Sequence, residues 1–175
     1  MRALLVLLFA LSVAGCGGVD VRQYAAEQPA LELSDYFNGE LEAWGMFQNR
    51  SGEVVKRFHV AMTGTWQGDV GTLDERFTYS DGSTERRVWT LRRQADGSWR
   101  GTAGDVVGEA IGEVSGNALH WRYQLLLKVD GEQYVVDFDD WMFLMDQRVM
   151  LNRARMSKWG IDLGQVTLSF YKPAK

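Results

Sequence analysis

Alternation of apolar and polar residues, repeated in short segments along most of the chain, is the feature that most constrains its fold. Residues 57–66 place Phe58, Val60 and Met62 on one face, and mostly polar residues occupy the other face. Residues 117–127 follow the same pattern. A period of two residues is typical of β-strands that bury one face, and it does not match a helix. The sequence therefore predicts an all-β domain.

Short turns separate these segments. Asp81-Gly82, Asp96-Gly97 and Asp130-Gly131 are pairs that favour tight hairpin turns. Turn signals recur about every 8–12 residues, with no long crossover connection between them. This spacing favours an antiparallel up-and-down β-barrel of about nine or ten strands, because closure removes exposed edges. A β-sandwich or a half-open barrel is the alternative. The predicted strands are 40–47, 57–66, 72–79, 86–92, 99–103, 117–127, 133–140, 140–145, 148–156 and 165–171.

The N-terminus has the layout of a bacterial lipoprotein signal. Arg2 supplies a positive start, residues 3–11 form an apolar core, and small residues precede Cys16, the only cysteine. This apolar run is shorter than the roughly 20 residues that a transmembrane helix needs. The sequence predicts cleavage before Cys16 and acylation of its thiol, which would anchor the mature protein to a membrane. Gly17 follows in place of the aspartate that favours inner-membrane retention, so we expect the outer membrane, facing the periplasm.

Three segments follow from this layout. Residues 1–15 are the predicted signal peptide, residues 16–30 a lipidated, flexible tether, and residues 31–175 a single β-barrel domain. Residues 31–37 are short and amphipathic, which predicts a helical turn lying over one end of the barrel.

Charge and aromatic content restrict the partners. The formal net charge is −4, which argues against nucleic acid or an anionic membrane face as the main partner, because both require a basic surface. Seven Trp, eight Phe and six Tyr favour half-buried strands, and they could also line an apolar cavity that takes a fatty acid or another amphiphilic lipid. Packing of the same rings into a filled core is the alternative. The candidates for the cavity wall are Trp44, Trp66, Trp89, Trp121, Tyr123 and Phe138.

Two arginines are candidates for binding the head group of such a ligand. Arg153 and Arg155 alternate with Ala154 and Met156 on one predicted strand. If their face points into the barrel, the guanidinium groups can meet a carboxylate or a phosphate. If it points outward, they are ordinary surface residues.

No catalytic or metal-binding pattern stands out. His59 and His120 are single histidines on separate predicted strands, whereas a metal site needs several ligands together. The glycine-rich segments 101–104 and 108–112 lack the helix that follows a phosphate-binding loop. We therefore expect no metal, no cofactor and no enzymatic activity.

Several short segments together resemble a family of bacterial lipoproteins catalogued as domain of unknown function 3833. The most specific are Asp139-Asp140-Trp141-Met142 and Leu151-Asn152-Arg153, and the resemblance covers roughly Leu33 to Lys172. It implies a lipoprotein associated with genes for membrane-lipid modification, and it carries over no catalytic residue. The triplet Gly64-Thr65-Trp66 is similar to a lipocalin motif, which adds the expectation of a lipocalin-like barrel.

Three functions remain open at this point. The favoured one is a lipid-anchored module that binds an amphiphile inside its barrel. The second is a structural or protein-interaction lipoprotein of the envelope with a filled core. The third is an enzyme that uses Asp139, Asp140 or His59, although an acidic segment of this kind is more typical of a strand end paired with arginines.

Overall fold

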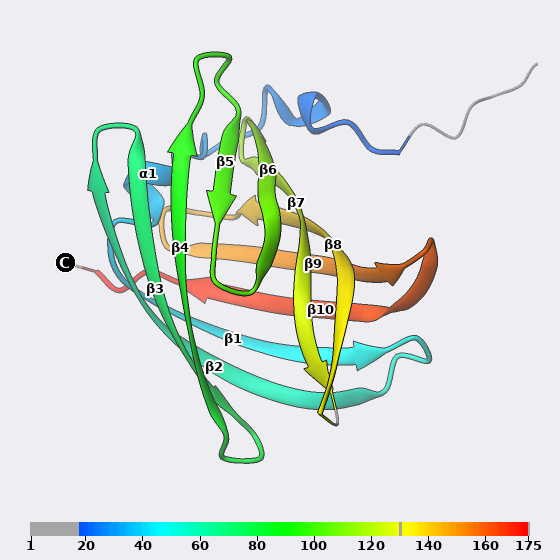
Figure 1. Cartoon of the computed structure of the whole chain (residues 1–175). Helices are drawn as coiled ribbons and strands as arrows, with labels where there is room; N and C mark the ends of the chain where they lie inside the picture. The colour runs from blue at the N-terminus through cyan, green and yellow to red at the C-terminus, as the bar shows by residue number, and fades with distance from the viewer. Residues whose placement is uncertain (1–17, 130, 175) are drawn as a thin grey trace, which may run out of the picture.

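The computed structural model describes residues 18–129 and 131–174. Within them, ten β-strands follow two short helical segments, and each strand pairs antiparallel with its neighbours (Figure 1). The helical segments are the 3₁₀ turn η1 (Val21–Tyr24) and the helix α1 (Leu33–Tyr36). The strands are β1 (Gly39–Asn49), β2 (Val54–Gln67), β3 (Val70–Tyr79), β4 (Thr84–Arg93), β5 (Trp99–Thr102), β6 (Val106–Ser115), β7 (Ala118–Val129), β8 (Glu132–Leu144), β9 (Val149–Lys158) and β10 (Ile161–Tyr171).

The strands form a closed barrel, because the first strand also pairs with the last. Across this β1–β10 seam Glu42 lies opposite Tyr171, and Asn49 lies opposite Gly164. The other pairs join consecutive strands through short turns. The predicted up-and-down β-barrel is therefore confirmed, and the sandwich is excluded. Side chains can just fill the interior of a barrel of eight strands. A barrel of ten strands is wider, so space can remain at its centre.

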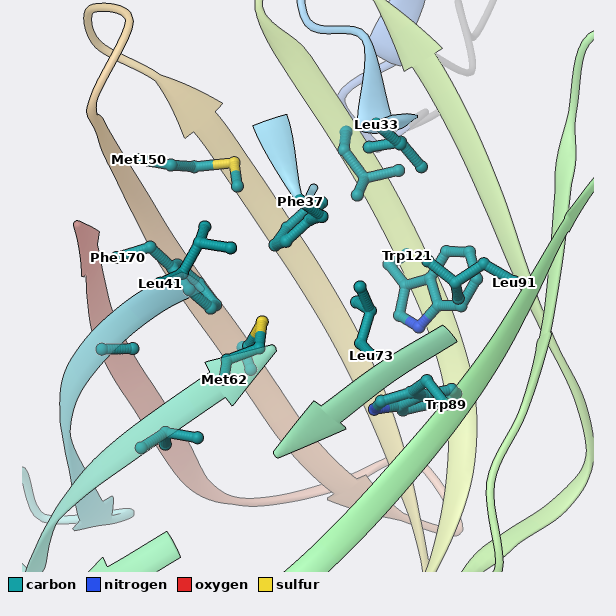
Figure 2. Close-up of a cluster of buried hydrophobic side chains, with 14 of the residues drawn as sticks. Leu33, Phe37, Leu41, Met62, Leu73, Trp89, Leu91, Trp121, Met150 and Phe170 are labelled. Carbon is teal, nitrogen blue, oxygen red and sulfur yellow. The ribbon is translucent and has the colours of Figure 1, made fainter. Parts of the chain in front are cut away.

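The two ends of the barrel differ. The hairpins β1–β2, β3–β4, β7–β8 and β9–β10 extend from one end, which we call the mouth (Figure 1). The other end, which we call the closed end, carries the helix α1. The turns that join β2 to β3, β4 to β5, β6 to β7 and β8 to β9 also lie there. There Leu33 and Phe37 are buried with Leu73, Leu91 and Trp121 (Figure 2). The helical turn predicted at 31–37 thus plugs the barrel.

Residues 18–30, which the sequence predicts to be part of a flexible tether, instead pack on the outside of the barrel near its closed end. Val21 is buried, and the ring of Tyr24 makes edge contacts with Trp141 and Phe143, at centroid distances of 6.0 and 5.1 Å. These contacts, and the hydrogen bond that the backbone N–H of Leu31 donates to the carbonyl oxygen of Gly116, attach this otherwise polar segment to the barrel. The polar composition of the segment gave no indication that it packs on the barrel.

The alternation of residues does not predict strand β6. Its pairing with β7 shifts register between Val107 and Ile111, around Gly108, whose φ is +70°. A bulge of this kind breaks the period of two residues. Beyond it the buried positions are Ala110 and Gly112, which lack the large side chains that make a buried face visible in a sequence.

The small size of these positions leaves room for Trp121. A methyl group added at Gly112 would lie 2.3 Å from the indole ring, and one added at Gly101 would lie 2.4 Å from it. Both distances are far below van der Waals contact. The two glycines therefore let the Trp121 ring lie flat against the barrel wall.

We expect Gly112→Ala to lower the free energy of unfolding by about 1–3 kcal/mol, because the Trp121 ring must shift inside a packed region. Urea unfolding followed by tryptophan fluorescence measures this loss. Gly104→Ala is the matched control, since a methyl group there meets no atom within 4 Å. Equal losses for the two variants would contradict the packing argument.

Candidate ligand-binding cavity

The barrel encloses a cavity of about 1010 Å³ that opens at the mouth. Its walls extend from Asn49, Ser83 and Lys128 at the mouth to Met62 and Trp121 near the closed end. A separate space of about 60 Å³ lies beyond it, beneath the plug. The barrel is therefore hollow, and its own side chains do not fill it.

One side of the cavity is apolar. Strands β2, β9 and β10 contribute Phe58, Val60, Met156, Val166 and Leu168 to it. These side chains point inward because they occupy alternate positions of their strands, as the period of two residues requires. A wall of this kind can bury a hydrocarbon chain, with about 0.8 kcal/mol gained for each methylene removed from water.

The opposite side carries a group of polar side chains that we call the polar cluster. Its members come from four strands and one turn that are distant in the sequence. Asp140 and Glu75 are 6% and 9% exposed, so both carboxyl groups are almost fully buried. The cluster consists of Glu75 on β3, Arg87 on β4, Asp105 in the β5–β6 turn, Tyr123 on β7 and Asp140 on β8.

Arg87 is bound mainly by one carboxylate of this cluster. Its Nε and Nη2 donate hydrogen bonds to Asp105, with Nε–Oδ2 and Nη2–Oδ2 distances of 2.9 and 2.7 Å. Its Nη1 lies 3.9 Å from Oε2 of Glu75, a longer contact. A two-point pair of this geometry fixes the guanidinium group. Arg87 is thus largely neutralised before any ligand enters.

Asp140, in contrast to Arg87, has few hydrogen-bond partners. Its Oδ2 accepts a long hydrogen bond of 3.4 Å from the Tyr123 hydroxyl group. Its Oδ1 is buried and has no hydrogen-bond partner among the described residues. A buried polar atom without a partner is unfavourable, and such atoms often mark functional sites.

Burial changes the protonation of the cluster. It raises the pKa of Asp140 to about 8, against the hydrogen bond from Tyr123, which lowers it. It also raises the pKa of Glu75 to about 7, against the charge of Arg87. Burial lowers the pKa of Arg87, but the hydrogen bond to Asp105 and the charge of Glu75 more than offset it, so that pKa is raised. Both deep carboxyl groups therefore titrate near neutral pH.

Five of the aromatic candidates lie on the inner side of the barrel wall. Trp89, Trp121 and Phe138 line the cavity. The ring of Tyr123 stacks on Phe138 at a centroid distance of 5.1 Å and meets Trp89 edge-on at 5.4 Å, so it supports the lining. Trp66 packs edge-on against the Trp99 ring at 5.6 Å.

Three candidates lie on the outer face and do not reach the cavity. Trp44 is 50% exposed and borders a second hollow of about 550 Å³ on the outside of the barrel. Arg155 pairs with Asp162 at 3.1 Å, and Arg153 donates a hydrogen bond to Gln165. Their strand turns Asn152, Ala154 and Met156 inward, so the alternation itself sends both arginines outward. The head-group role predicted for them required the opposite face.

The residues considered for catalysis are separated by the barrel wall. Asp140 faces the cavity, whereas Asp139 lies outside and forms a contact of 2.7 Å with His120. His59 is also on the outer face, 3.8 Å from Glu42. Among residues 18–129 and 131–174, no group of three or more His, Cys, Asp or Glu side chains is placed to hold a metal ion. The predicted lipidation site, Cys16, lies outside the described residues.

Sequence analysis missed Glu75, Arg87 and Asp105. One signal was available, because Glu75 is a charged residue on the otherwise apolar face formed by Leu73, Phe77 and Tyr79. A charge at such a position is rare without a partner or a function. The sequence does not indicate which residues surround it.

The fold and the cavity define the class of protein: it is a hollow β-barrel with the polar cluster on its inner wall. The chain belongs to the family described as protein of unknown function (DUF3833), whose profile matches residues 10–172. A sequence search of curated proteins finds no match. In the part of the chain that the structure describes, no helix has the length and apolarity needed to span a membrane.

Proposed function

We propose that this protein is a lipoprotein of the bacterial cell envelope whose lipocalin-like barrel binds one amphiphilic lipid. The observation that carries the proposal is the open, largely apolar cavity of about 1010 Å³. Pockets for small ligands have volumes of about 300–1000 Å³, and they are mostly apolar with a few polar groups that orient the ligand. The apolar wall suits a hydrocarbon tail, and the polar cluster suits a head group. Fatty acids are one class of such ligands.

The proposed anchor is a lipid on Cys16. The apolar core before it and the small residues Ala14 and Gly15 support this step. Acyl chains on the N-terminal cysteine would hold the barrel at the outer membrane on its periplasmic side, because several chains together bind a bilayer stably. Reversible binding of a lipid needs a cavity and no nucleophile, so the proposal includes no catalytic step.

The proposal is tested by filling the cavity. Val166 lies on the apolar wall, and we expect Val166→Trp to reduce uptake of a fluorescent lipid analogue with an uncharged head group at least tenfold, because the indole occupies the space of the tail. Thr167→Trp is the matched control, since Thr167 is the next residue on β10 and faces outward, on the 550 Å³ hollow. Native mass spectrometry of the protein from its own host identifies any lipid that co-purifies. A protein that is always free of lipid and takes up no probe would refute the proposal.

A structural or protein-interaction role is the second candidate, and one observation favours it. Large apolar side chains are exposed around the mouth, with Trp159 86% exposed at the tip of the β9–β10 hairpin. Ile161 on the same hairpin and Val55 near the start of β2 are exposed at 58% and 60%. Exposed apolar residues in one region mark interaction surfaces. The lipid-uptake experiment separates the candidates, because a purely structural protein would not respond to Val166→Trp.

A further inference from the structure

We propose that the head group of the ligand is a positively charged amine, held by the carboxyl groups of Asp140 and Glu75 against aromatic rings. This inference rests on the proposed function, in which an amphiphile occupies the cavity. The expected ligand is then an amphiphilic amine with a hydrocarbon tail, in place of a fatty acid.

The first argument is the missing donor at Asp140. Its carboxyl group lines the cavity, and the residue is only 6% exposed. Oδ1 has no partner among the described residues, and Oδ2 has only the 3.4 Å contact with Tyr123. When Asp140 is ionised, the site therefore accepts hydrogen bonds, and an ammonium group supplies up to three. A ligand carboxylate would bring further acceptors and no donor.

The second argument is the charge around the cluster. Three acidic residues face a single cation, Arg87, and Asp105 already holds that cation on two nitrogens. The charged or titratable groups that act on Asp140 are Glu75 on β3, Arg87 on β4, Tyr123 on β7 and Asp139 on its own strand. A second positive charge would complement the two deep carboxyl groups. A buried carboxylate is favourable only when it is paired in this way.

The third argument is the aromatic surface beside the carboxyl groups. Trp89 and Trp121 meet edge-on at a centroid distance of 5.8 Å, and Phe138 joins them in the cavity wall. Trp121 is paired directly with Asp140 across β7 and β8. Rings and carboxylates together form the usual environment for organic ammonium groups, which bind over aromatic faces.

The amine and the fatty acid predict opposite effects of pH. A primary amine stays protonated up to about pH 10. It binds best to ionised carboxyl groups, so binding releases a proton from Asp140 below pH 8 and strengthens as pH rises. A ligand carboxylate needs the neutral form of the same groups, and its binding weakens as pH rises.

The experiment compares decylamine, decanol and decanoate, which share a tail length and differ in the head group. The protein is the mature chain with Cys16→Ser, which removes the acylation site and keeps every described element. Isothermal titration calorimetry at pH 6 and pH 8 gives the Kd values, with all ligands below their micelle concentrations. We expect decylamine to bind most tightly at pH 8, with a Kd at least tenfold lower than at pH 6, since one released proton changes affinity up to about tenfold per pH unit.

Variants assign the effect to the polar cluster. Asp140→Asn should weaken decylamine binding at pH 8 at least tenfold and leave decanol unchanged, whereas Asp137→Asn, on the outer face of the same strand, should change neither. Proton release, measured in two buffers of different ionisation enthalpy, tests the same point without a variant. If decanoate binds as tightly as decylamine at pH 8, or the pH slope is reversed, the amine is wrong and lipid binding stands. If none of the three probes binds, both proposals fail.

Discussion

Replacing Arg87 with methionine should lower the free energy of unfolding by about 3–5 kcal/mol at pH 8, the loss expected when one member of a buried ion pair is removed. Arg87 is largely buried between Asp105 and Glu75, with distances of 2.7 and 3.9 Å to their oxygens. Without the guanidinium group, both carboxyl groups lose the cation that offsets their desolvation. Urea unfolding at pH 8 measures the change.

The neighbouring residue provides a matched control. Arg86 has the same side chain and pairs with Asp74 at 2.9 Å, but it points outward and is largely exposed. Exposed ion pairs contribute about 0–1 kcal/mol, so Arg86→Met should have a small effect. The double variant Arg87→Met with Asp105→Asn should recover part of the stability, because it removes one of the unpaired charges. If Arg86→Met and Arg87→Met are equally harmful, the polar cluster has no special energetic role.

The empty barrel should lose stability as pH rises from about 4 to about 8, and Asp140→Asn should remove much of that loss. The pKa of Asp140 is about 8 in the folded protein and 3.8 as its ordinary value, and that of Glu75 is about 7 against 4.5. At a pH between the ordinary and the folded pKa of each group, the carboxyl group is largely ionised in the unfolded chain and largely protonated in the folded chain. Higher pH therefore favours unfolding, by up to about 1.4 kcal/mol per pH unit for each group.

Thermal unfolding at pH 5 and pH 8 measures this slope. Asp140→Asn keeps the shape and the acceptor for Tyr123 but cannot ionise, so it should be more stable than the parent at pH 8 by several kcal/mol and should differ little at pH 4. Glu75→Gln should act in the same direction over a window that ends near pH 7. Asp137→Asn, which changes a carboxyl group on the outer face of the same strand, should leave the slope unchanged. A parent whose stability rises from pH 5 to pH 8 would contradict the assigned protonation states.

The fold was predictable from the sequence because its signals are local. The inward side chains of residues 57–66 and the Asp-Gly turns define strands and hairpins without knowledge of distant contacts. The prediction failed where local signals are weak or interrupted. Strand β6 contains a bulge and small inward residues, and residues 133–140 and 140–145, predicted as separate strands, form the single long strand β8.

The candidate site was less predictable, because it depends on which strands face one another across the barrel. Trp89, Trp121 and Phe138 were identified as wall residues because large aromatic side chains occur at inward positions. Arg153 and Arg155 were misplaced because the sequence left the direction of their face open. The polar cluster joins β3, β4, β7 and β8 with the turn at Asp105, a neighbourhood that closure of the barrel creates and no local pattern contains.

If the proposed lipid anchor and ligand are correct, the docked N-terminal segment limits the side on which the ligand is exchanged. Val21 is buried near the closed end, and four residues lie between it and Cys16. An extended chain spans at most about 3.5 Å per residue, so a lipid on Cys16 would sit within about 17 Å of Val21. A connection this short would hold the closed end of the barrel toward the membrane that carries the lipid. The mouth would then point away from that membrane. The proposed ligand would then enter and leave on the side away from that membrane, where the exposed side chain of Trp159 lies.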